Sequence, residues 1–155
     1  MERKFRLRIL LGILLLILTF NLPNILTFSI KRDKVLLEVF NRNLNLIGQF
    51  CKKGEYRYPF FTSITFGNMP DGDVVAYCHR KANGFSLVFD KRYWGILSEV
   101  DRNQLMMHEM AHCMFNERHS TNPKHFMSAS MNELTEQELN VQVYDFLNKK
   151  CGGEK

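Results

Sequence analysis

Apolar side chains recur every three or four residues in three stretches of the chain, which is the spacing of one helix face. The first stretch is Asp33–Phe50, and the other two begin at Ser98 and at Thr135. Ser98 is followed three residues later by Asp101, and Thr135 by Glu138, which is the spacing of capped helix starts. The sequence therefore predicts three helices, two of them with a defined start.

Three short segments between the first two helices are rich in β-branched and aromatic residues, as strands are. They are Phe61–Phe66, Val74–Arg80 and Phe85–Phe89. Asn83-Gly84 separates the last two, and an Asn-Gly pair between strands is typical of a hairpin. We therefore expect a small α+β domain with an N-terminal helix, a short twisted sheet, a central helix, a loop and a C-terminal helix.

The basic excess of the chain is concentrated at its start. The formal net charge is +5, and the first eight residues contribute +3 of it, with four basic side chains against Glu2. Residues 31–155 carry 17 basic and 15 acidic side chains. Because this larger part is nearly neutral, it lacks the broad basic surface of a nucleic-acid-binding protein, and no nucleic-acid partner is expected.

An uncharged segment of 22 residues, 9–30, follows the basic start. Its first twelve residues are almost all apolar, as in a secretory signal, and the whole segment is just long enough to span a bilayer. We interpret 1–30 as a signal peptide or an N-terminal membrane anchor and 31–155 as one exported domain. That domain would be secreted, periplasmic or anchored outside the cytoplasm, with membrane association through residues 9–30 if they are not cleaved. A buried N-terminal helix, the alternative, leaves the basic cluster unexplained.

All four cysteines lie in this domain: Cys51, Cys78, Cys113 and Cys151. In an oxidising compartment four cysteines commonly form two disulfides, and three pairings are possible. Four buried free thiols are the alternative. No pair has the C-x-x-C spacing, which excludes a zinc ribbon or a thioredoxin-type motif.

The predicted central helix contains His108-Glu109-Met110-Ala111-His112, a match to the H-E-x-x-H pattern. Residues four apart on a helix share a face, so His108 and His112 can both bind one Zn²⁺ ion. Zinc lowers the pKa of a bound water, and the neighbouring Glu109 carboxylate can accept the proton of that water as it attacks a carbonyl. The pattern therefore indicates hydrolysis with one catalytic zinc ion and Glu109 as general base.

A third ligand is needed to close such a site, and His119 is the strongest candidate. It lies seven residues after His112, and Asn116 between them can adopt the left-handed conformation that ends a helix and reverses the chain. Arg118 is a poor ligand because its guanidinium is always cationic. The rival ligands are a histidine and three carboxylates: His125, Glu133, Glu136 and Glu138.

The segment His119–Met127 resembles the third-histidine-to-Met-turn segment of matrix metalloproteinases, in the metzincin clan of zinc peptidases. In that clan a methionine follows the third histidine by eight residues, as Met127 follows His119 here. Other segments are similar to the strand, tryptophan and C-terminal helix of the family: Gly84–Asp90, Trp94 and 134–144. The resemblance covers about residues 62–148 and implies a small metzincin-like zinc-peptidase domain.

The resemblance also implies roles for individual residues. The zinc ligands would be His108, His112 and His119, and Met127 would form an apolar floor beneath the metal. The segment Val74–Arg80 matches the family's edge strand, which would pair with an extended peptide or protein substrate. The pairing residues would be Val74, Val75, Ala76 and Tyr77.

The chain departs from the family's pattern in two places. It has one more residue before the third histidine than H-E-x-x-H-x-x-G-x-x-H, with Phe115 in place of the glycine. We interpret this as an insertion in which Asn116 takes over the turn. The stretch between Phe66 and Phe85 is short and lacks the ligands of the family's structural zinc and calcium ions, so we expect only the catalytic ion.

Together these patterns predict an exported zinc-dependent endopeptidase that hydrolyses peptide bonds through a metal-activated water. Loop residues 120–132 would line the pocket for the residue after the cleaved bond. The alternative is an exported zinc-binding domain without catalysis that acts as a binding or interaction module. A membrane-associated scaffold with a fortuitous motif is a third hypothesis.

Overall fold

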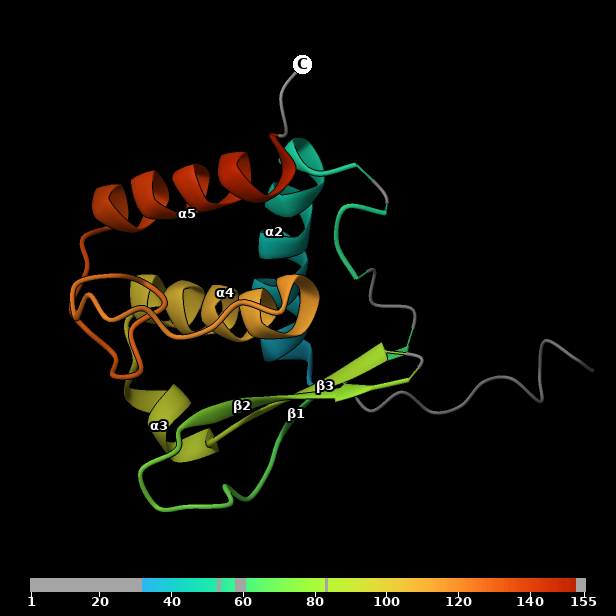
Figure 1. Cartoon of the computed structure of the whole chain (residues 1–155). Coiled ribbons are helices and arrows are strands. Elements are labelled where there is room, and N and C mark those ends of the chain that lie inside the picture. The colour runs from blue at the N-terminus through green and yellow to red at the C-terminus, as the bar shows by residue number, and fades with distance from the viewer. Residues whose placement is uncertain (1–31, 53, 58–60, 83, 153–155) are drawn as a thin grey trace, which may run out of the picture. The chain divides into compact units, whose positions relative to one another are not determined.

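The computed structural model describes residues 32–52, 54–57, 61–82 and 84–152 (Figure 1). The predicted signal peptide or anchor, residues 1–30, lies outside the described residues. None of the helices within the described ranges combines the length and the apolar composition that crossing a bilayer requires.

The described residues form helices and one three-stranded sheet, so the predicted α+β class is confirmed. In chain order the elements are α2 (Lys34–Phe50), β1 (Phe61–Phe66), β2 (Ala76–Lys81), β3 (Gly84–Phe89), α3 (Lys91–Ile96), α4 (Glu99–Phe115) and α5 (Glu136–Cys151). Figure 1 shows α2, α4 and α5 on one side of the sheet, with α4 between α5 and the strands. The helix that carries the H-E-x-x-H residues is therefore the central one.

The three predicted helices are confirmed, and the two predicted caps, at Ser98 and Thr135, are found where expected. Asp33 caps α2, and reciprocal capping boxes start the other two, Ser98 with Asp101 and Thr135 with Glu138. The short helix α3 was not predicted, because its six residues are too few for a helical period to appear in the sequence.

The strand order in the sheet is β1-β3-β2. β3 pairs with β2 in antiparallel fashion, which confirms the predicted hairpin, and pairs with β1 in parallel. β2 therefore lies at an edge of the sheet. It begins at Ala76, so the prediction that Val74 and Val75 belong to the strand is wrong. The Val74 N–H instead closes a turn onto the Asp71 carbonyl (3.2 Å), whereas the Val75 carbonyl, just before the strand, accepts a hydrogen bond from the Asp90 N–H (2.9 Å).

The core lies between the sheet and α4. In β3 the side chains of Phe85, Leu87 and Phe89 are fully buried. They belong to one apolar cluster with the methionines of α4, which are Met106, Met107, Met110 and Met114. Burial of such surface contributes roughly 25 cal/mol per Å² to stability. This packing fixes α4 on the sheet and determines which side of the helix remains available for chemistry.

Both disulfides connect segments that are distant in sequence. Cys51–Cys151 joins the end of α2 to the end of α5 across a separation of 100 residues. Cys78–Cys113 joins β2 to α4 across a separation of 35 residues. Of the three possible pairings, the fold therefore selects this one, and such bonds persist in oxidising, extracytoplasmic environments.

Replacing Cys51 and Cys151 together by alanine is expected to lower the free energy of unfolding by about 3–5 kcal/mol, because the unfolded chain gains the entropy of a long open loop. The matched variant Cys78→Ala/Cys113→Ala opens a shorter loop. Its free energy of unfolding should therefore fall by roughly 1 kcal/mol less, because less loop entropy is gained. Urea unfolding of the three proteins measures both values. Unchanged stability in the first variant would contradict the assigned pairing.

Candidate metal centre

His108 and His112 project from the same side of α4, toward the chain that follows this helix. Nδ1 of His108 lies 2.9 Å from the carbonyl oxygen of Phe126, and Nδ1 of His112 lies 2.6 Å from that of Glu117. A carbonyl oxygen can only accept a hydrogen bond, so each Nδ1 carries the proton and donates it. Both rings are thereby held in one orientation, with Nε2 left for a ligand.

The chain reverses after α4 at Asn116, whose φ of 57° and ψ of 33° are left-handed. Among the described residues it is the one non-glycine residue with a positive φ. The backbone N–H groups of Asn116 and Glu117 both donate to the Ala111 carbonyl, and the Asn116 side chain accepts a hydrogen bond from Arg80 of β2. The predicted turn at Asn116 is confirmed, and it places the Glu117 carbonyl against His112.

This reversal brings His119 to the two helical histidines. The Nε2 atom of His112 lies 3.0 Å from that of His108 and 3.1 Å from that of His119. One potential ligand atom from each ring lies within 4.8 Å of the others, so the three residues could hold a metal ion. Within the described ranges no other group of three histidine, cysteine or acidic residues is arranged in this way.

The Nε2 atoms of His108 and His112 cannot satisfy each other. Because Nδ1 carries the proton in each neutral ring, both Nε2 atoms present lone pairs across 3.0 Å. Burial lowers the pKa of His108 to about 4 and also lowers the pKa of His112, so both rings are neutral near pH 7. Converging lone pairs repel each other, whereas a cation between them attracts both. The arrangement therefore favours a bound metal ion.

Glu109 follows His108 in α4, and only 5% of its surface is exposed. This burial raises the pKa of Glu109 to about 7, although a hydrogen bond from the backbone N–H of Cys78 in β2 acts in the opposite direction. A carboxyl group with a pKa near 7 can both accept and release a proton at neutral pH. Glu109 is therefore suited to general acid–base chemistry beside the histidine cluster.

Amide side chains hold the loop that follows His119. Gln142 of α5 accepts a hydrogen bond from the Phe126 N–H (2.7 Å) and donates to the Lys124 carbonyl (2.9 Å). It therefore positions the Phe126 carbonyl that orients His108. Two further amides bind each other and the same loop: Gln104 and Asn132. The sequence analysis missed all three, because a polar residue on a helix or loop carries no periodic signal of a distant partner.

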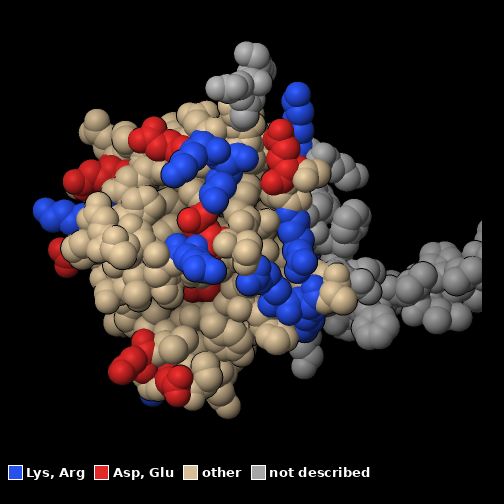
Figure 2. Space-filling view, viewed as in Figure 1, with Lys and Arg blue, Asp and Glu red and all other residues tan. Residues whose placement is uncertain are grey.

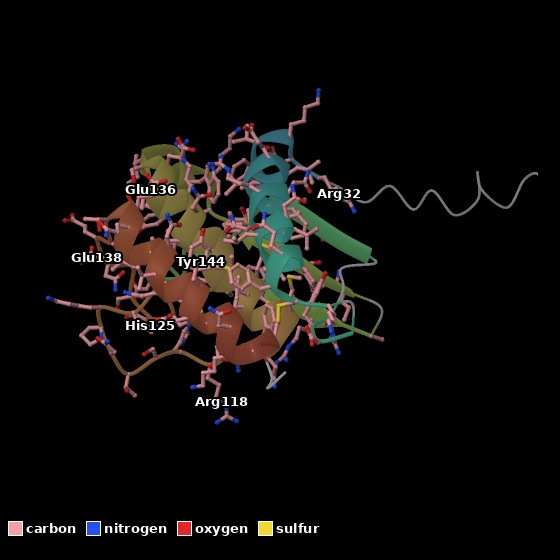
Figure 3. All side chains as sticks on the ribbon, turned by 90° about the horizontal axis from the view of Figure 1, so that it is seen from above. Arg32, Arg118, His125, Glu136, Glu138 and Tyr144 are labelled. Atoms are coloured by element: carbon pink, nitrogen blue, oxygen red, sulfur yellow. A yellow bond between two sulfur atoms is a disulfide. The ribbon has the colours of Figure 1, made fainter. Side chains whose placement is uncertain are left out.

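The other predicted site residues lie around the cluster. Met127 is buried, and its carbonyl accepts a hydrogen bond from the Ser120 N–H (2.7 Å). The rival ligand His125 is outside the cluster, and its Nδ1 accepts the Met127 N–H (3.0 Å). Figure 3 shows Arg118 projecting away from the fold. The three rival carboxylates are also outside the cluster: Glu133, Glu136 and Glu138.

A cavity of about 630 Å³ lies beside the cluster, and Glu109 and all three histidines line it. One wall is formed by residues 73–78, which include all four predicted substrate-pairing residues. Residues 128–131 form another wall, as expected for part of the loop 120–132. Tyr93 and Leu105 add aromatic and aliphatic surface. The cavity is therefore large enough for a side chain of a peptide that lies along β2.

Comparisons with family models, with curated proteins and with solved structures find no match to this chain.

Asn116→Val is expected to weaken divalent-metal binding by about 10-fold or more, because a β-branched residue resists the left-handed conformation and the Glu117 carbonyl would leave His112. Asn116→Gly is the matched control, since glycine adopts the same φ freely. Competition for Zn²⁺ with a chromophoric chelator measures both affinities. Equal affinities in the two variants would show that the turn does not support the centre.

Proposed function

We propose that the protein is an exported zinc-dependent endopeptidase with a metzincin-like fold. The observation that carries this proposal is the convergence of two neutral, carbonyl-oriented imidazoles beside a buried glutamate with a pKa near 7. The order of the elements and the position of His119 after a helix-ending turn support the resemblance to matrix metalloproteinases. The two disulfides support export.

Zinc is the metal that suits this donor set. Three imidazoles with one remaining position are a common ligand set of catalytic zinc. Tetrahedral zinc with Zn–N distances of about 2.0–2.1 Å separates its ligand nitrogens by about 3.3 Å. The distances of 3.0 and 3.1 Å between the histidine nitrogens are within a few tenths of an ångström of that value. The same histidines line the cavity, which makes a fourth position accessible to substrate.

Bound zinc would supply Lewis-acid chemistry, polarising the scissile carbonyl and lowering the pKa of water. The Glu109 carboxylate accepts one proton from the attacking water while the water oxygen bonds to the carbonyl carbon. Glu109 then delivers this proton to the leaving nitrogen as the C–N bond breaks. The products, a free amine and a carboxylic acid, together contain the atoms of the peptide and of one water molecule.

His119→Ala is expected to lower zinc affinity by more than about 100-fold, because a direct ligand should cost more than the 10–100-fold typical of residues that only orient ligands. His125→Ala removes the neighbouring histidine outside the cluster, and its zinc affinity should stay unchanged. Zinc content after dialysis and chelator competition distinguish them. A large loss in His125→Ala with none in His119→Ala would reverse the assignment of the third ligand.

Glu109→Gln preserves the shape and the neutral form of this buried side chain. We expect it to bind one zinc ion per chain and to lose at least about 100-fold in kcat/KM for peptide hydrolysis, since the general base is gone. A quenched fluorescent peptide library and metal analysis of the full chain provide both readouts. Unchanged hydrolysis in Glu109→Gln would contradict the mechanism. A wild-type chain that holds one zinc ion and cleaves no peptide would favour the non-catalytic binding module.

A further inference from the structure

The edge of β2 that faces the cavity has backbone groups available for a peptide. The Val75 carbonyl bonds the N–H of the residue that follows β3 (2.9 Å), so alternate residues of β2 direct their backbone groups toward β3. The residues between them direct theirs away from β3, toward the open edge of the sheet: Ala76, Cys78 and Arg80. Of these, Ala76 and Cys78 line the cavity. The Cys78 N–H, which bonds the Glu109 carboxylate, follows this alternation. An extended peptide can therefore pair with this edge.

Glu109 also sets the register of such a peptide. Because its carboxylate bonds the Cys78 N–H, the bond to be cleaved lies near the level of Cys78. Beyond that level β2 ends in Arg80 and Lys81, and the guanidinium of Arg57 donates to the Lys81 carbonyl (3.3 Å). We name Arg57, Arg80 and Lys81 the basic end of the β2 edge. Lys81 is three residues from Cys78, about 10 Å along the strand at about 3.3 Å per residue.

The opposite end of the β2 edge carries the opposite charge. Asp71 and Asp73 precede β2 and are exposed, and Asp73 lines the cavity. We name these two residues the acidic end. On the face shown in Figure 2, acidic atoms gather over the loop that precedes β2, and basic atoms gather where β2 ends. A peptide along β2 therefore meets positive charge on one side of the catalytic glutamate and negative charge on the other.

Among the described residues no salt bridge neutralises either end. The ion pairs among the described residues are Arg42–Glu99, Arg92–Asp90 and Lys150–Glu117, and none includes a residue of either end. Arg80 binds the Asn116 side chain, but an amide is neutral and leaves the positive charge in place.

Strand pairs are more often antiparallel than parallel, and the antiparallel ladder is slightly more stable per residue. A peptide antiparallel to β2 places its N-terminal part beside the basic end and its C-terminal part beside the acidic end. We propose that the substrate is a peptide of defined charge order, with acidic residues before the cleaved bond and basic residues after it. This proposal rests on the proposed peptidase function.

Four quenched fluorescent peptides test this order with the zinc-loaded full chain. They share one apolar centre and differ only in flanks: acidic before and basic after, the reverse, glutamine on both sides, and acidic on both sides. The first should be cleaved with kcat/KM about 10-fold above the second at low salt, because several exposed charge pairs each contribute a small factor. Sodium chloride at 0.5 M should reduce this ratio. Fluorescence anisotropy with the inactive Glu109→Gln chain should rank the affinities of the peptides in the same order.

Charge reversal assigns the preference to each end. Lys81→Glu should reduce the preference for acidic residues before the bond, and Asp73→Lys the preference for basic residues after it. Lys34→Glu changes charge to the same extent beside β1, on the far edge of the sheet, and should leave the ranking unchanged.

The outcomes separate the two proposals. Equal cleavage of the first two peptides, or preference for the reversed one, overturns the charge order while the peptidase function stands. Equal cleavage would indicate that the basic end serves instead to keep the free edge of β2 from pairing with another copy of the chain. If the chain cleaves none of the four peptides and no member of a broader peptide library, the peptidase function is overturned, and the charge order with it.

Discussion

Two hydrogen bonds from imidazole Nδ1 atoms to backbone carbonyls determine the geometry of the candidate metal centre. The Phe126 and Glu117 carbonyls fix the protons of His108 and His112, so the two Nε2 lone pairs converge. Helical spacing alone places these rings on one face but does not orient them. Both carbonyls come from the segment after α4, so the centre depends on how that segment is held: by the reversal at Asn116 and by the amide of Gln142.

The same centre is connected to the sheet through β2. The Cys78–Cys113 disulfide, the Arg80–Asn116 hydrogen bond and the Cys78 N–H at the Glu109 carboxylate all join this strand to α4 or to its end. Glu109, the helix-ending turn and the edge that would receive a peptide therefore form one unit. Such a unit is preorganised, because positioning a peptide on β2 also positions it against Glu109.

Features with a local physical cause could be predicted from the sequence. The capping boxes, the β2–β3 hairpin and the turn at Asn116 depend on neighbouring residues and agree with the structure, as does the α+β class. Features that depend on distant partners could not be predicted in this way. The disulfide pairing, the carbonyls that orient the histidines and the role of Gln142 arise only when the chain is folded. The start of β2 was misplaced for a related reason, because Val74 and Val75 have strand-forming side chains but lie in a turn and a cavity wall.

In the proposed site three imidazoles and no sulfur atom bind one zinc ion. X-ray absorption at the zinc edge of the purified full chain tests it most directly. The account predicts one zinc ion per chain with only nitrogen or oxygen neighbours at about 2.0–2.1 Å, and multiple-scattering features from three imidazoles. A sulfur neighbour at about 2.3 Å, fewer than three imidazoles, or no stoichiometric zinc would contradict it.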